Sequence, residues 1–166
     1  MKIESPVTSA SGIPSEARAG PGRLVRSFRW SYAVTSWLLV VAVVTQFLLA
    51  GFGVFARGDF CKLAPDEGFG CGFGLHAVFG RGILSLLVLL VLVLSFAARA
   101  PRRTVGLTAG LLGLFALQTV LLLPYGVPPF QPLAALHVVN GLLLLFVALR
   151  VAGRARRLLA PESSSR

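Results

Sequence analysis

The sequence predicts an all-α integral membrane protein, a four-helix bundle of two helical hairpins in pseudo-repeat with both termini in the cytoplasm. Three observations carry this prediction: four long apolar runs, positive charges that collect on one side of these runs, and a short motif that occurs twice. The 166 residues are 55% hydrophobic and only 13% charged, and the mean hydropathy is +0.81. This composition is typical of membrane proteins and not of soluble globular domains.

Each of the four apolar runs is long enough to cross the hydrocarbon core of a bilayer, which takes about 20 helical residues. The predicted spans are residues 30–52, 75–98, 104–123 and 133–152, within a transmembrane domain of residues 30–155. Polar and apolar residues do not alternate along these runs, so the pattern favours helices. Ser, Pro, Gly and Ala dominate residues 1–29, which we expect to be disordered, as we expect of the tail at 156–166.

Positive charges lie mainly on one side of the four runs. They precede the first run, lie in the turn between the second and third, and lie at or beyond the end of the fourth: Arg18, Arg23, Arg26, Arg29, Arg99, Arg102, Arg103, Arg150, Arg154, Arg156 and Arg157. On the other side, Arg57 and Lys62 are offset by neighbouring acids. Because Lys and Arg in short loops resist translocation, we expect a multi-pass plasma-membrane protein with both termini in the cytoplasm.

The net charge of +10 bears on the partners that the chain can have. It suits a protein embedded in a lipid bilayer, because basic residues beside membrane helices attract anionic lipid headgroups. The basic residues are scattered over three segments without interleaved aromatic residues, which disfavours binding to nucleic acid.

The only two histidines open two of the apolar runs in the same motif, His-x-Val-x-Gly. The two copies are His76-Ala77-Val78-Phe79-Gly80 and His137-Val138-Val139-Asn140-Gly141. Residues four apart share one face of a helix, so each histidine has a glycine one turn further on. The predicted topology places both histidines at the same depth on the extracytoplasmic side. Gln46 and Gln118 lie in the outer halves of the preceding runs, which makes the whole pattern a repeat.

Two imidazoles at matched depth indicate a metal or cofactor site. Imidazole is a ligand of iron, copper and zinc, and a haem held by two of them favours electron transfer over oxygen activation. We therefore expect haem b or a related haem with His76 and His137 as axial ligands. Gly80 and Gly141 would clear space, and Arg81 would pair with a propionate. The amides of the remaining candidates would hold imidazole N–H groups or propionates: Gln46, Gln118 and Asn140.

Two other functions compete with haem binding. Polar residues in membrane helices often only hydrogen-bond a neighbouring helix, at about 0.6 kcal/mol on average, which would make this chain a non-catalytic interaction or assembly subunit. A proton-coupled transporter is disfavoured, because the predicted spans contain no Asp or Glu.

Cys61 and Cys71 lie in the first loop on the extracytoplasmic side. Oxidising conditions there favour a disulfide, which would stabilise the folded chain by about 2–3 kcal/mol in the chain-entropy model. A redox role is disfavoured because the C-x-x-C motif is absent. A metal site that joins both thiols to His76 and His137 is a further alternative.

The order of these features resembles one four-helix half of haem A synthase, and also small four-helix membrane proteins of the same layout. The resemblance covers residues 30–155 and rests on Cys61, Cys71, His76 and His137. It implies a haem near the outer face, held by histidines of the second and fourth helices.

The sequence also departs from haem A synthase in two respects. That family has a Glu close before the histidine of its second helix, where this chain has Gly72 and Phe73. The other half of the enzyme is missing. The enzyme assignment therefore does not carry over to this chain on its own. A homodimer would rebuild an eight-helix arrangement, and a haem would need a partner that gives or takes electrons, for example within a larger membrane complex.

Overall fold

The computed structural model describes residues 22–55, 73–122 and 135–160. The helices in these ranges are α1 (Arg23–Phe55), α2 (Gly74–Phe79), the π-helix η3 (Gly80–Leu84), α3 (Ser85–Ala97), α4 (Arg102–Val120) and α5 (Leu136–Arg157). α2, η3 and α3 follow one another without a break, so they form one helix of membrane-spanning length. The described residues thus contain four helices long and apolar enough to cross a membrane, which confirms the predicted helical membrane fold.

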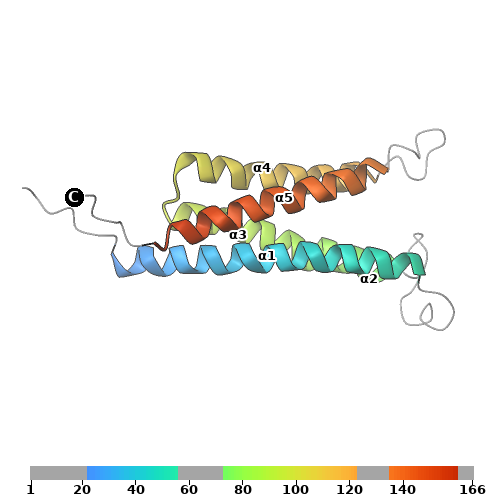
Figure 1. Cartoon of the computed structure of the whole chain (residues 1–166), viewed down its shortest axis with the longest axis horizontal. Coiled ribbons are helices and arrows are strands. Elements are labelled where there is room, and N and C mark those ends of the chain that lie inside the picture. The colour runs from blue at the N-terminus through green and yellow to red at the C-terminus, as the bar shows by residue number, and fades with distance from the viewer. Residues whose placement is uncertain (1–21, 56–72, 123–134, 161–166) are drawn as a thin grey trace, which may run out of the picture.

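The four helices pack side by side as a bundle (Figure 1). α1 packs against α3 and α5, and α4 packs against the same two helices. This arrangement leaves α1 diagonally opposite α4, and the α2–η3–α3 helix diagonally opposite α5. The N-terminal end of α1 and the C-terminal end of α5 lie at the same end of the bundle, which we call the inner end.

Two helix ends differ from the sequence prediction. α1 begins at Arg23, so residues 23–29, which we expected to be disordered, are helical. α5 continues past the predicted end of its span to Arg157. Both extensions are rich in arginine, which is a good helix former and, in the last turn of α5, interacts favourably with the helix dipole. The ends of α1 and α5 therefore differ from the ends of the apolar runs, because both helices continue into the arginine-rich residues that flank these runs.

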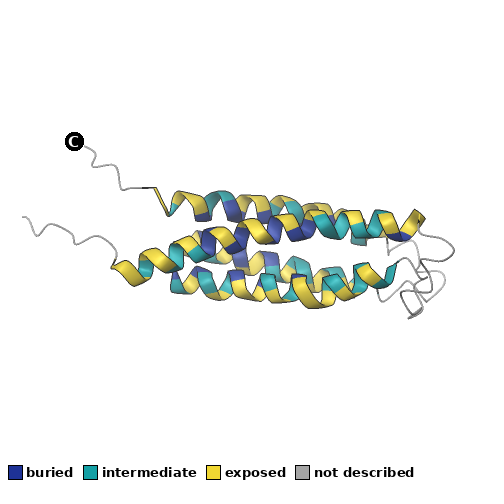
Figure 2. Cartoon of the chain, turned by 90° about the horizontal axis from the view of Figure 1, so that it is seen from below, coloured by how far each residue is buried: buried dark blue, intermediate teal, exposed yellow. Residues whose placement is uncertain are grey.

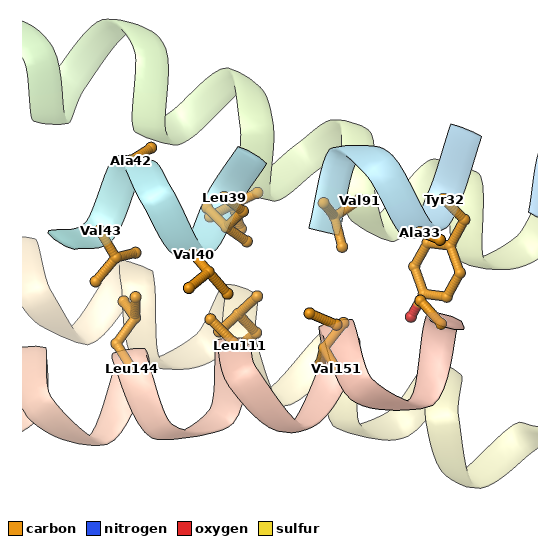
Figure 3. Close-up of a cluster of buried hydrophobic side chains, with 14 of the residues drawn as sticks. Tyr32, Ala33, Leu39, Val40, Ala42, Val43, Val91, Leu111, Leu144 and Val151 are labelled. Carbon is orange, nitrogen blue, oxygen red and sulfur yellow. The ribbon is translucent and has the colours of Figure 1, made fainter. Parts of the chain in front are cut away.

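The hydrophobic core lies mainly in the inner half of the bundle (Figures 2 and 3). Its fully buried members come from all four helices and include Leu39, Val88, Val91, Leu111 and Val151. Val43 of α1 and Leu144 of α5 continue this core away from the inner end, at 3% exposure each. Small residues of α5, Ala148, Ala152 and Ala155, let the neighbouring helices approach closely there.

A layer of buried hydroxyl groups lies among these apolar side chains. Tyr32 is fully buried, and its hydroxyl lies 2.9 Å from Oγ1 of Thr108, which joins α1 to the diagonally opposite α4. The Thr108 hydroxyl donates its proton to the carbonyl oxygen of Thr104 at 3.0 Å. Because a hydroxyl has only one proton, Tyr32 is the donor in the hydrogen bond between α1 and α4. In α1, Ser36 donates to the carbonyl of Tyr32 at 2.7 Å, the same bond one turn back along the helix.

The opposite end of the bundle, which we call the outer end, is packed less tightly. Asn140 is buried there, but most of the side chains that face the interior are only partly buried: Gln46, Phe47, His76, Phe79 and His137. In Figure 2 the dark blue of buried residues gives way to teal toward this end. The bundle is thus closed at its inner end and looser at its outer end, where both histidines lie.

Candidate functional site: a histidine pair at the outer end

His76 is tied to α1 by two hydrogen bonds with one residue, Gln46. The amide Nε2 of Gln46 donates to the carbonyl oxygen of His76 at 2.9 Å. In return, the ring Nδ1 of His76 lies 3.1 Å from the carbonyl oxygen of Gln46. Each residue therefore uses its side chain on the main chain of the other. Phe73 adds an edge-on ring contact to His76, with 6.2 Å between ring centroids.

His137 is tied to α4 by the same two bonds with Gln118. Nε2 of Gln118 donates to the carbonyl oxygen of His137 at 2.9 Å, and Nδ1 of His137 lies 2.9 Å from the carbonyl oxygen of Gln118. A third residue joins this pair. Nδ2 of Asn140, which is only 6% exposed, donates to Oε1 of Gln118 and, at 2.9 Å, to the carbonyl oxygen of Leu114.

These bonds fix which ring nitrogen carries the proton. A carbonyl oxygen can only accept a hydrogen bond, so Nδ1 of each histidine must be the protonated nitrogen. Nε2 is then the nitrogen that keeps its lone pair in the neutral ring. In metal-bound histidines in general, the ring nitrogen that does not bind the metal donates such a hydrogen bond, and this bond sets both the tautomer and the ring orientation.

The two histidine rings meet across the bundle, although they come from diagonally opposite helices. Their centroids are 6.3 Å apart and their planes are inclined by 60°. The sequence prediction that both histidines share one depth and one side of the bundle agrees with this geometry. The sequence did not predict that a glutamine main-chain carbonyl would orient each ring.

The two glycines of the motif make room for neighbouring side chains of α1 and α4. A Cβ at Gly80 would lie 2.8 Å from Nε2 of Gln46. At Gly141 it would lie 3.2 Å from Cζ of Phe47 and 3.4 Å from Nε2 of Gln118. We expected both glycines to clear space for a cofactor. The space beside them instead holds the glutamine amides and, at Gly141, the ring of Phe47.

Replacing Gly80 by Ala should therefore disturb the Gln46–His76 pair. The new methyl group would push the Gln46 amide away from the carbonyl that it binds, and overpacking of this kind costs about 1–3 kcal/mol. A more favourable helix propensity would offset about 0.5–1 kcal/mol of that loss. We expect a lower midpoint of thermal unfolding, measured by circular dichroism in detergent micelles.

Gly82 provides the matched control, because a Cβ there meets no atom of the described residues within 4 Å. Gly82→Ala should leave the unfolding midpoint unchanged or raise it. An equal drop for the two variants would mean that the Gln46 amide is not the cause.

The other predicted site residues lie at different distances from the pair. Arg81 is exposed in η3, where the Ser85 hydroxyl lies within hydrogen-bond distance of its carbonyl oxygen and of that of Gly82. Cys61 and Cys71, and with them the predicted disulfide, lie outside the described residues. The sequence analysis missed Phe47 and Phe79, and only their place next to Gln46 and Gly80 in the chain could have indicated them.

Comparison with known proteins gives one family model that matches part of the chain, and no activity. Residues 46–124 match the model of a family of unknown function, DUF6220. No curated protein and no solved structure matches the chain. The matched stretch begins at Gln46 and includes His76 and Gln118, so it contains one complete glutamine–histidine pair and half of the other.

Proposed function

We propose that this chain is a membrane haem-binding protein with His76 and His137 as axial ligands, acting in electron transfer or haem handling. The observation that carries the proposal is the geometry of the two rings. They lie 6.3 Å apart across the bundle, and each has its Nδ1 proton on a main-chain carbonyl and its Nε2 lone pair left for a metal.

The ring separation suits one metal ion held between two imidazoles. Bonds from a metal to imidazole nitrogen of about 2.0–2.1 Å, together with the distance from each nitrogen to its ring centre, place two centroids about 6 Å apart. The histidines come from diagonally opposite helices, so a flat macrocycle between them would extend along the gaps between neighbouring helices. Phe47 and Phe79 are partly buried near the histidines and would supply apolar contacts to the edges of such a group.

Each residue of the site then has a definite task. Gln46 and Gln118 fix the tautomer and orientation of the histidines through their carbonyl oxygens, and their amides fix the histidine main chain. Asn140 holds the amide of Gln118. Gly80 and Gly141 let the glutamine amides approach, and Arg81 is the residue that we assign to a propionate. A haem with two imidazole ligands supplies one-electron oxidation and reduction of its iron.

The alternative is a non-catalytic interaction or assembly subunit, and one observation favours it. Each histidine already makes a reciprocal pair of hydrogen bonds with a glutamine of the neighbouring helix. Such bonds join membrane helices without any cofactor. The two functions differ in their use of Nε2, which only a ligand requires.

Substitution by asparagine separates the two functions, because the Asn amide nitrogen can take the place of Nδ1 while nothing takes the place of Nε2. We expect the wild-type protein, purified from haem-supplemented cells, to have a Soret band that the double variant His76→Asn/His137→Asn lacks. Both proteins should retain the same helical circular dichroism. A colourless wild-type protein would refute haem binding and leave the assembly function.

We also propose that the two hairpins are an internal repeat with both termini in the cytoplasm of a plasma-membrane protein. The repeated Gln–His bonds and the matching hydroxyl bonds, from Ser36 in α1 and Thr108 in α4, support the repeat. The arginines at the inner end support the orientation. A reporter fused to the C-terminus that is reached only from outside the cell would contradict it. A homodimer or larger complex, and the electron partner, stay predictions.

A further inference from the structure

The two halves of the site support their histidines unequally. Both amide atoms of Gln118 are hydrogen-bonded, Nε2 to His137 and Oε1 to Asn140. Oε1 of Gln46 is buried and has no hydrogen-bond partner among the residues that the structure describes. The reason lies in the motif, because the third residue after His137 is Asn140, whereas the third residue after His76 is Phe79. A buried acceptor without a donor is costly, so the Gln46–His76 pair is the weaker of the two.

The helices that carry the histidines also differ. His137 lies in the uninterrupted helix α5, and Leu144 and Val151, at successive steps of seven residues, are buried. An α-helix returns to nearly the same face after seven residues. The same steps connect Leu84, Val91 and Ala98 in the helix of His76, and all three are buried. Seven residues before Leu84, however, the chain has Ala77 and not His76.

His76 therefore lies eight residues before Leu84, whereas His137 lies seven residues before Leu144. The π-helix η3 (Gly80–Leu84), which follows His76 and ends at Leu84, accounts for the additional residue, because the wider turn of a π-helix accommodates one residue more than an α-helix does. His76 thereby reaches the interior, where its ring faces that of His137. If the wide turn closed to an α-turn, Ala77 would face inward and His76 would turn away, while α3 kept its packing. α2 contains no buried residue that would resist this rotation.

We propose that His76 is the exchangeable ligand of this site and His137 the fixed one, so that a small neutral ligand can take the iron position that His76 leaves. This inference rests on the proposed haem function. In the exchange, the bond from iron to Nε2 of His76 breaks and a bond from iron to the incoming ligand forms. No electron is transferred, and His76 keeps its Nδ1 proton. Gln46, Phe79 and η3 act as positioning elements for His76.

The test uses the full-length protein, reduced with dithionite, with carbon monoxide as the probe. We expect His76→Asn to retain haem within about twofold of wild type, with the spectrum of five-coordinate iron and rapid formation of the carbon monoxide complex. His137→Asn should lose haem about tenfold. Equal loss of haem in the two variants, or greater loss in His76→Asn, would overturn the inference.

Phe79→Asn is the second variant, because it gives Oε1 of Gln46 the donor that Asn140 gives to Gln118. It should slow carbon monoxide binding about tenfold relative to wild type, since it strengthens the support of His76. An unchanged or faster rate would contradict the role of this position. Val78→Asn is the matched control, because Val78 is 71% exposed and does not face the site.

Hydrogen exchange gives a readout that needs no carbon monoxide. Backbone amides of residues 76–84 should exchange several-fold faster than those of residues 137–144, and equal rates would count against the inference. Failure of the proposed function is recognised separately, because a wild-type protein without a Soret band removes both proposals. If the wild-type protein has a bis-histidine spectrum but His76→Asn and His137→Asn lose haem equally, haem binding stands and only the exchange of His76 is refuted.

Discussion

Replacing Tyr32 by Ala is expected to lower the free energy of unfolding by about 3–5 kcal/mol, as for other large aromatic side chains in protein cores. Tyr32 is fully buried at the inner end, so its removal leaves a cavity among α1, α4 and the facing helices. The hydrogen bond to Thr108, which joins the two hairpins, is lost as well. The measurement is unfolding in mixed micelles of mild detergent and dodecyl sulfate, followed by circular dichroism.

The control for this prediction is Tyr32→Phe, which keeps the ring and removes only the hydroxyl. It should cost about 0.6 kcal/mol, and at most about 1.7, which is the range for single hydrogen bonds between membrane helices. The Thr108 hydroxyl keeps its bond to Thr104 in this variant. If Tyr32→Phe were as destabilising as Tyr32→Ala, the hydroxyl layer and not the packing would hold the inner end together.

Replacing Gln118 by Leu should be the most damaging change in the outer half, at about 1–3 kcal/mol of unfolding free energy. The variant loses the bonds from Gln118 to His137 and from Asn140 to Gln118 at nearly unchanged volume. The polar groups of His137 and Asn140 then lose a partner inside the bundle. The same unfolding experiment in mixed micelles measures the effect.

Gln46→Leu is the matched variant in the other hairpin and should cost less. It breaks the single amide bond to His76 and at the same time removes the buried Oε1, which has no partner in the described part of the chain. Equal losses for the two variants would show that Asn140 adds nothing to the pair formed by Gln118 and His137. A greater loss for Gln46→Leu would reverse the order of the two halves that the hydrogen bonds indicate.

The fold was predictable because its cause is local in the sequence. Long apolar runs must form helices to satisfy their backbone in lipid, and the runs alone locate four of them. Helix ends were less predictable, since arginines at Arg23 and Arg157 extend the helices past the apolar residues. The hydroxyl layer was missed. Its signal was nevertheless present, because Tyr32 and Ser36, and likewise Thr104 and Thr108, recur one turn apart.

The meeting of the two histidines was predictable, but the hydrogen bonds around them were not. His76 and His137 come together because each lies in the first turn of a helix that begins at the outer end of the bundle. Which atom of Gln46 meets which atom of His76 depends on the rotation of two helices about their axes, and residue type does not specify that. The π-helix also depends on the rotation of a helix about its axis. The sequence nevertheless contained a sign of it, because the spacing from His76 to Leu84 is one residue longer than the spacing from His137 to Leu144.

The position of the histidines at one end of the helices limits where a redox reaction with this chain can take place. His137 lies in the first turn of α5, and Arg157 ends that helix. At about 1.5 Å per residue, the helix separates the two by about 30 Å, which is the thickness of the hydrocarbon core. An electron on the proposed haem would therefore be exposed to one membrane surface and insulated from the other. If the proposed haem is bound, its donor and acceptor must approach from the same side, and this chain would pass electrons along the membrane surface and not across it.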